Sequence, residues 1–267
     1  RRNLRKIDND EMYRIDVRRL RGQIHTDKEE GLAPFCVVGM AGTTNCGAID
    51  NLNELGDICT EHGLWFHVDA PWGGTVRFSN KYRSLLDGIE RSDSVTIDPH
   101  KWMYVPFCAG AILVRDAEDL RRCFDIRPAY VSDKAFVEGQ PTNFFQYGVA
   151  GSRRFDSLKI WWSLRHYGRR TYERVINERI ALAEYLERRL SELKDFEIIS
   201  HATLAMCGFR FFPSQLRDEW QKADAKRRVV INELVDRLNS EIQVEIVESG
   251  RAWVSTTMLN GVRAIRF

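Results

Sequence analysis

The chain has 267 residues, 43% of them hydrophobic, which suits one large domain or a medium domain with a small second one. Its 40 lysine and arginine residues nearly balance 38 acidic ones, so the net charge of +2 gives no basic footprint for nucleic acid. This composition excludes a disordered chain, and a core of this size needs no disulfide or metal to stabilise it.

The cysteines indicate the cellular compartment of the protein, and the ends of the chain indicate a fragment. The six cysteines form no C-x-x-C pair and lie mostly in apolar segments, which is typical of buried thiols in a reducing compartment. We find no apolar run long enough to cross a bilayer, no signal peptide and no histidine spacing typical of a metal site, so we expect a cytoplasmic protein without membrane, nucleic-acid or metal partners. Because the chain begins without methionine and ends inside the strand-like pattern of 262–267, we also expect a fragment.

The first predicted elements are a helix and a strand. Apolar positions within residues 10–31 permit a helix. The apolar run 34–41 predicts a strand buried on both faces, and it is closed by Gly42-Thr43-Thr44, whose hydroxyl groups suggest a loop at a functional site.

A helix and a second strand follow. Residues 51–62 carry apolar positions at helical spacing, with Asp50 as the expected N-cap and Gly63 as the C-terminal stop. The run 64–69 predicts another buried strand. The strand–helix–strand order predicts a parallel sheet, in which ligands gather at the carboxyl ends of the strands.

The rest of the chain changes character near Gly168, from alternating strands and helices to an α+β pattern. In chain order we expect helical structure at 84–89, strands at 94–97 and 110–115, a loop at 129–147, helices at 155–167 and 171–193, strands at 196–199 and 207–212, a helix at 225–238 and two final strands. The predicted fold class is therefore α/β, with a mostly parallel sheet and flanking helices in a domain of residues 1–167, followed by a small, truncated α+β domain of residues 168–267.

Two residues with reactive side chains lie at the end of one predicted strand and shortly after another. Asp69 closes the run 64–69, and Lys101 ends the segment Asp98-Pro99-His100-Lys101 after the strand 94–97. A lysine partly removed from water more readily supplies the neutral amine that forms a Schiff base with a carbonyl. A carboxylate beside it suits the nitrogen of a pyridinium ring, which is the pairing that pyridoxal phosphate needs to act as an electron sink.

At these positions the sequence resembles a known family. The segments His67-Val-Asp69-Ala-Pro-Trp-Gly-Gly74 and Asp98-Pro-His-Lys101-Trp102 are similar to motifs of the pyridoxal-phosphate-dependent amino-acid decarboxylases that include the aromatic-amino-acid, glutamate and diaminobutyrate enzymes. The resemblance covers nearly the whole chain and includes Gly42-Thr43-Thr44, Arg127-Pro-Ala-Tyr130 and Ser152-Arg-Arg-Phe155. It implies part of the large domain of a fold-type I pyridoxal-phosphate enzyme with a small C-terminal domain.

The resemblance also implies roles for individual residues. Lys101 is expected to form the Schiff base with pyridoxal phosphate, and Asp69 to partner the nitrogen of the pyridine ring. Thr44 is expected to line the cofactor, and His100 to touch its phosphate or the substrate. Tyr130 matches a loop tyrosine implicated in protonating the carbanion carbon, a position where phenylalanine accompanies aldehyde formation, so Tyr130 favours decarboxylation.

Asp98 departs from the commonest pattern, which has asparagine near the phosphate. A carboxylate about 4 Å from a phosphate charge costs on the order of 4 kcal/mol per unit charge at an effective dielectric constant near 20. Asp98 is therefore protonated, turned toward a donor, or farther from the phosphate than asparagine would be. Arg153 and Arg154 either meet a substrate or cofactor anion or form structural pairs with nearby acids.

By the same resemblance, the segment that grips the phosphate and the histidine that stacks on the ring lie upstream, outside this chain. We expect the site to be completed in a homodimer or in an assembly with that segment. The first hypothesis is the lysine-bearing portion of an amino-acid decarboxylase. The others are a partner-binding remnant without activity, and a relative that uses the cofactor for another reaction.

The substrate of such a decarboxylase is less well indicated. Phe155, Trp161 and Trp162 resemble the aromatic and diamino-acid branches of the family, and they favour an aromatic amino acid. The turn that follows Asp69 is closer to the glutamate type, so glutamate- or diaminobutyrate-type substrates remain the alternative.

Overall fold

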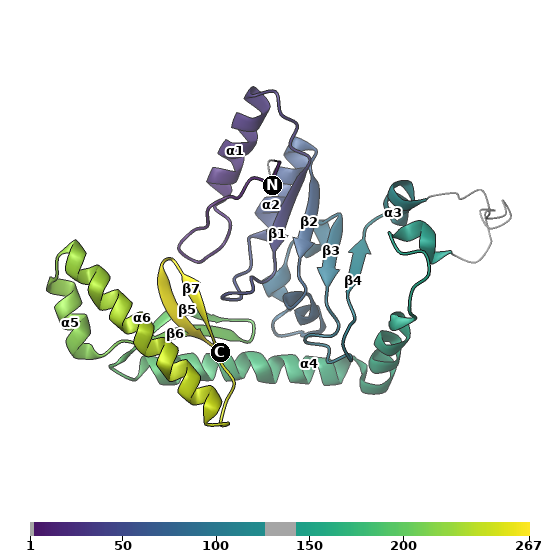
Figure 1. The fold of residues 1–267 in the computed structure, drawn as a ribbon. Coiled ribbons are helices and arrows are strands. Elements are labelled where there is room, and N and C mark those ends of the chain that lie inside the picture. Colours follow the sequence, from purple (N-terminus) through teal and green to yellow (C-terminus); the bar gives the residue numbers. More distant parts are fainter. Residues whose placement is uncertain (1–2, 126–142) are drawn as a thin grey trace.

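The computed structural model describes residues 3–125 and 143–267, which form two four-stranded sheets (Figure 1). The first sheet has the order β1 (Cys36–Met40), β2 (Trp65–Asp69), β3 (Ser94–Ile97) and β4 (Ala111–Val114). The second has the order β5 (Phe196–Thr203), β6 (Met206–Phe211), β8 (Val262–Arg266) and β7 (Ser255–Leu259). Strands β1, β2 and β3 are parallel, β4 is antiparallel to β3, and the second sheet is entirely antiparallel. The predicted α/β class with a mostly parallel sheet is confirmed, while the domain boundary at 167/168 stays a prediction.

The helices agree with the expected order but exceed it in number and length. The α-helices are α1 (Val17–Glu29), α2 (Leu52–His62), α3 (Ala117–Phe124), α4 (Asp156–Ser191), α5 (Ser214–Lys222) and α6 (Ala225–Glu248). Short 3-10 turns are η1 (Gly73–Phe78), η2 (Arg83–Leu86), η3 (Ile89–Arg91) and η5 (Phe144–Tyr147). The sequence did not predict α3 and α5, and η2 and η3 replace the single helical segment expected at 84–89.

Helix α2 has a different N-cap from the expected one, whereas it ends at the expected residue. The side chain of Asn51 caps the helix by accepting from the Glu54 backbone N–H at 3.3 Å. The prediction of Asp50 as the cap is wrong, because its carboxylate instead accepts the backbone N–H groups of Met40 and Ile15, each at 2.7 Å. Gly63 ends the helix in the left-handed conformation, with φ of 64°, as expected.

The first sheet is buried on one face and half-open on the other. Val37, Phe66 and Val68 are buried in the main core. A Cβ atom at Gly39 would lie 2.7 Å from Leu55, which shows that α2 lies close over this face. On the opposite face Val38 is 45% exposed. The prediction that the strand at 34–41 is buried on both faces is therefore wrong, since in the described part of the chain its residues alternate between inside and outside.

The element α4 contains the two helices predicted at 155–167 and 171–193, which meet at a kink, and its longer second part runs beneath both sheets (Figure 1). Gly168 interrupts its helical dihedral angles, with φ of 70° and ψ of 163°. The buried side chains of Tyr172, Ile176 and Ile180 belong to the main core, whereas Leu190 belongs to the core of the second sheet. One helix thus contributes to the cores of both sheets. No helix in the two described stretches is both long enough and apolar enough to cross a membrane.

Candidate active site

The loop between β3 and β4 holds Lys101 at the carboxyl edge of the parallel strands. Its first residue, Asp98, donates its backbone N–H to the carbonyl of Pro71 at 3.1 Å, which joins it to the loop after β2. The Lys101 backbone N–H closes a turn onto the carbonyl of Asp98 at 2.9 Å. The next side chain, Trp102, is only 2% exposed and stacks on Trp72, with ring centroids 4.7 Å apart. The loop is thereby anchored on both sides of Lys101.

The ammonium group of Lys101 pairs with Asp98. Lys101 Nζ lies 3.0 Å from Asp98 Oδ2, and the two side chains are 38% and 21% exposed. Of the three alternatives that the sequence left open for Asp98, the structure shows the one in which the carboxylate is turned toward a donor. Lys101 is therefore charge-paired and exposed to solvent.

His100 packs beside this pair and bonds to the far end of the same loop. Its Nδ1 atom lies 2.5 Å from the carbonyl oxygen of Ala109 and 3.2 Å from the Ala109 backbone nitrogen. Because these two contacts need opposite protonation of Nδ1, only one operates at a time. The Nε2 atom lies 4.0 Å from Asp98 Oδ2, and the ring meets Phe107 edge-on. His100 thus braces the loop while its Nε2 faces the Asp98 carboxylate.

Asp69 is the last residue of β2 and lies between Met40 of β1 and Thr96 of β3 in the strand register. Its carbonyl accepts the backbone N–H of Ala41 at 2.9 Å. Among the residues that the structure describes, no side chain or backbone group bonds to its carboxylate. The carboxylate oxygens are accordingly open to a ligand at the same sheet edge as Lys101.

A polar chain on the same face as Asp69 was not foreseen from the sequence. Trp65 Nε1 donates to Ser94 Oγ at 2.9 Å, and Ser94 Oγ lies 2.7 Å from His67 Nδ1. The other ring nitrogen of His67, Nε2, lies 3.1 Å from Thr96 Oγ1. The spacing His67-x-Asp69 puts both side chains on one face of β2, but their hydrogen-bond partners depend on the register between β2 and β3. These contacts hold the imidazole of His67 at both nitrogens, two residues before Asp69.

Two other residues expected in the site are Thr44 and Tyr130. Thr44 is exposed in the loop after β1, and its carbonyl accepts from Arg266 Nη1 of β8 at 2.7 Å. The loops after β1 and β2 approach closely, since a Cβ atom at Gly73 would lie 2.3 Å from the Ala41 carbonyl oxygen. No hydrogen bond or ion pair joins Thr44 to the Lys101 loop within the described stretches. Tyr130 lies outside the described residues.

The two arginines before α4 make local contacts. Arg153 Nη2 donates to the backbone carbonyls of Phe144 and Ala150, at 3.1 and 3.3 Å. Arg154 pairs with Asp156 at 3.8 Å. Arg154 thus forms the pair with a nearby acid that was one of the two alternatives, whereas the contacts of Arg153 are to backbone carbonyls.

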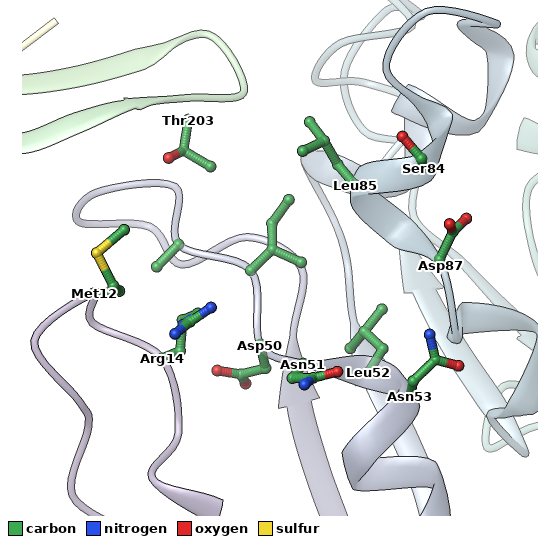
Figure 2. Close-up of a pocket in the computed structure, with 12 residues that line it drawn as sticks. Met12, Arg14, Asp50, Asn51, Leu52, Asn53, Ser84, Leu85, Asp87 and Thr203 are labelled. Atoms are coloured by element: carbon green, nitrogen blue, oxygen red, sulfur yellow. The ribbon is translucent and has the colours of Figure 1, made fainter.

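A cavity elsewhere in the structure lies beside Arg14 and Asp50 (Figure 2). It has a volume of about 380 Å³ and is lined by Arg14, Asp50 and Leu85 among other residues, with none from the loop 98–110. Burial raises the pKa of Asp50, although its two backbone N–H partners act in the opposite direction. Across residues 3–125 and 143–267, no group of three or more His, Cys, Asp or Glu residues is arranged to hold a metal ion.

Comparisons with known proteins show the family of this chain. The family model described as "Pyridoxal-dependent decarboxylase conserved domain" matches residues 2–212. The chain is 38% identical over 262 residues to "Aromatic-L-amino-acid decarboxylase" of Bacillus atrophaeus, an alignment that covers 98% of this chain and 52% of that protein. It is 36% identical over 230 residues to "Cysteine sulfinic acid decarboxylase" of Mus musculus, which covers 85% of this chain and 46% of the relative. The chain therefore spans about half the length of the curated relatives it matches.

Solved structures give the same result for the fold. The chain matches mouse CSAD with a TM-score of 0.85 and 31% identity, over 98% of this chain and 53% of that one. It matches the structure titled "Oryza sativa TDC with PLP and tryptamine" with a TM-score of 0.88 and 29% identity, over 100% of this chain and 53% of that one. Since the family model spans most of the sequence and includes the β2 end and the Lys101 loop, this chain belongs to the pyridoxal-dependent decarboxylase family.

Proposed function

We propose that this chain carries the lysine-bearing part of an active site for pyridoxal-phosphate-dependent decarboxylation of an L-amino acid to the amine and carbon dioxide. The observation that carries the proposal is the placement of Lys101 and Asp69 at one sheet edge, on loops joined by the Asp98–Pro71 hydrogen bond. The residues fit the cofactor, because the Lys101 amine is reachable by an aldehyde and the Asp69 carboxylate has open oxygens for a ring N–H.

When bound, pyridoxal phosphate supplies an electron sink for the electrons that departing carbon dioxide leaves behind. The Asp69 carboxylate accepts the ring N–H and holds the positive charge on that nitrogen. His100 braces the loop through Ala109 and would lie beside the phosphate or the substrate, and Thr44 would contribute a hydroxyl after β1. Tyr130 delivers the proton to the α-carbon.

An aromatic amino acid is our proposed substrate. Support comes from the 38% identity to the Bacillus atrophaeus protein named for aromatic L-amino acids and from the fold match to the tryptamine-bound rice structure. Relatives named for aspartate and cysteine sulfinate are 35% and 36% identical, so acidic substrates form the second arm of the test. A panel with L-tryptophan, L-tyrosine, L-glutamate, L-2,4-diaminobutyrate and cysteine sulfinate, followed by carbon dioxide release, separates them.

We further propose that the site is completed by residues outside this chain, in a homodimer or in an assembly with a polypeptide that grips the phosphate. Support comes from the share of its relatives that the chain spans, 52% of the Bacillus atrophaeus protein. Sedimentation of the protein with and without pyridoxal phosphate measures the assembly directly.

The test of the proposed function is covalent capture of the cofactor. The protein is mixed with pyridoxal phosphate, its visible absorbance is recorded, borohydride is added, and the modified peptide is identified by mass spectrometry. We expect an adduct on Lys101 that disappears in Lys101→Ala and persists in the control Lys81→Ala, whose side chain is exposed on another loop. An adduct only after the missing polypeptide is added supports the assembly, whereas no adduct in either case supports the partner-binding alternative.

A further inference from the structure

The carboxylate of Asp98 is enclosed in a way that aims it at the Lys101 nitrogen. Its Oδ2 atom lies 3.0 Å from Lys101 Nζ and 4.0 Å from His100 Nε2. Its Oδ1 atom would lie 3.4 Å from a Cβ atom at Gly110, so the backbone at Gly110 lies close to the other oxygen. With only 21% of the side chain exposed, the carboxylate meets cationic or protonatable groups on one side and backbone on the other.

The loop holds this geometry through its backbone. The N–H of Asp98 is bonded to Pro71, the N–H of Lys101 to Asp98, and the N–H of Val105 to the carbonyl of Pro99 at 3.1 Å. Trp102, buried against Trp72, fixes the chain directly after Lys101. The backbone of the loop therefore helps to fix the distance between Asp98 Oδ2 and Lys101 Nζ, in addition to the side-chain rotamers.

Other charged groups near the loop already have partners or lie on a different strand. Lys159 of α4 donates to the Cys108 carbonyl at 2.7 Å and pairs with Asp156 at 3.1 Å. Asp69 stands at the end of β2, and no ion pair joins it to Lys101 within the described residues. Asp98 is thus the carboxylate in contact with Lys101 Nζ in the part of the chain that the structure describes.

The charge on the Lys101 nitrogen is the same before and after an aldehyde attaches. An ammonium group and an aldehyde give a protonated Schiff base and one water molecule, so the nitrogen keeps one positive charge while the C=N bond replaces the C=O bond. A carboxylate 3.0 Å from the ammonium nitrogen offsets its charge, and it would offset the charge of a protonated Schiff base at the same position, which an asparagine would not. Beside a phosphate the same carboxylate would be repelled.

We propose that Asp98 is the counter-ion of the Lys101 nitrogen and faces away from the cofactor phosphate. This inference rests on the proposed function for the Schiff-base state, but the ion pair itself stands on the protein alone. Asp98 then favours the protonated, more electrophilic Schiff base, and the phosphate is bound by other groups.

The first experiment needs no cofactor. The protein is acetylated with limiting acetic anhydride at neutral pH, and Lys101 is compared by peptide mass spectrometry with Lys222, an exposed reference lysine. We expect Asp98→Asn to acetylate Lys101 about threefold faster, because the Lys101 nitrogen is no longer held in a partly exposed ion pair. Asp98→Glu, which keeps the charge, should stay close to the native rate. The matched control Asp87→Asn removes an exposed carboxylate elsewhere and should change nothing. Equal rates in Asp98→Asn and the native protein overturn the proposal.

The second experiment uses the protein loaded with pyridoxal phosphate or with pyridoxal, which lacks the phosphate. We expect Asp98→Asn to move the pH at which the visible band of the protonated Schiff base is lost downward by roughly half a unit to one unit. The ratio of the two affinities should stay unchanged. If Asp98→Asn instead tightens pyridoxal phosphate alone, Asp98 faces the phosphate and the proposal is wrong. If native protein forms no adduct even with the polypeptide that completes the site, the proposed function fails, and the acetylation result decides the ion pair by itself.

Discussion

The indole of Trp72 stacks on that of Trp102, with centroids 4.7 Å apart and planes inclined by 17°. Trp72 follows the strand that ends at Asp69, and Trp102 follows Lys101, so this contact holds the two candidate catalytic loops together. We expect Trp102→Ala to destabilise the protein by about 3–5 kcal/mol, the usual cost of emptying a buried aromatic site, and to reduce capture of pyridoxal phosphate on Lys101. Urea denaturation measures the first effect. Trp253→Ala, at a side chain that is 75% exposed, serves as the control and should cost less than about 0.5 kcal/mol.

Asp69 gives a prediction about rate. Asp69→Asn removes the negative charge that we assign to the ring nitrogen, and we expect decarboxylation to slow on the order of 10²–10³-fold, as when one preorganised electrostatic partner is lost. Borohydride capture on Lys101 should persist, because Lys101 is held by its own loop. Carbon dioxide release under saturating cofactor measures the effect. A rate within about twofold of the native protein, which is about 0.4 kcal/mol, would remove Asp69 from the mechanism.

Tyr130 gives a prediction about product. If its hydroxyl protonates the α-carbon, Tyr130→Phe should shift the product from amine toward aldehyde while the cofactor still attaches to Lys101. Chromatography of both products after the reaction measures the partition. An unchanged amine yield contradicts the role.

The cysteines should separate into reactive and protected groups. Cys108 and Cys123 are exposed, whereas Cys59 and Cys207 are buried. Burial raises the pKa of each of these two thiols to about 12, so almost none of either is thiolate at neutral pH. We expect iodoacetamide to modify the exposed pair in the native protein and the buried pair only in denaturant, as peptide mass spectrometry will report. Rapid native labelling of Cys59 would mean that the core opens on the labelling timescale.

Asp50 gives a prediction about pH. Its folded-state pKa is raised above 3.8 by burial, so the folded protein binds more protons than the unfolded chain as this group titrates. The contribution of Asp50 to stability is therefore fully present below its ordinary pKa and decreases as pH rises through the raised value. Asp50→Asn should cost about 1–3 kcal/mol, because an amide cannot accept both backbone N–H groups. The free energy lost should be larger near pH 4 than at pH 7, and urea denaturation at both values checks it. A loss that grows with pH would contradict the assigned direction.

Much of the first sheet was predictable because its strands are short apolar runs bounded by residues with clear local roles, such as Gly63 after α2. The helices α3 and α5 were missed for a physical reason. Each is short, with eight residues in α3 and nine in α5, so only a few apolar positions, such as Leu120 and Phe124 or Leu216 and Trp220, mark the inward face of the helix. The half-open face of β1 was also unpredictable, since a strand does not show what covers it.

The candidate site was predictable to the extent that strand ends position it. Asp69 ends β2 and Lys101 lies shortly after β3, and parallel strands bring their carboxyl ends to the same edge of the sheet. The direction of the Asp98 side chain was left open, because it depends on the turn of the loop and on Gly110. The partners of His67 depend on a register that pairs it with Ser94, which no local pattern reports.

After the break at Gly168, the later part of α4 packs into two cores, through Ile176 and Ile180 in one and Leu190 in the other. If either core melts, part of this helix loses its apolar partners, and an isolated helical segment of that length is marginal in water. The two sheets are consequently coupled in folding free energy even though they share no strand. A mutation in the core of the second sheet is thus felt, through α4, by the core that supports Lys101.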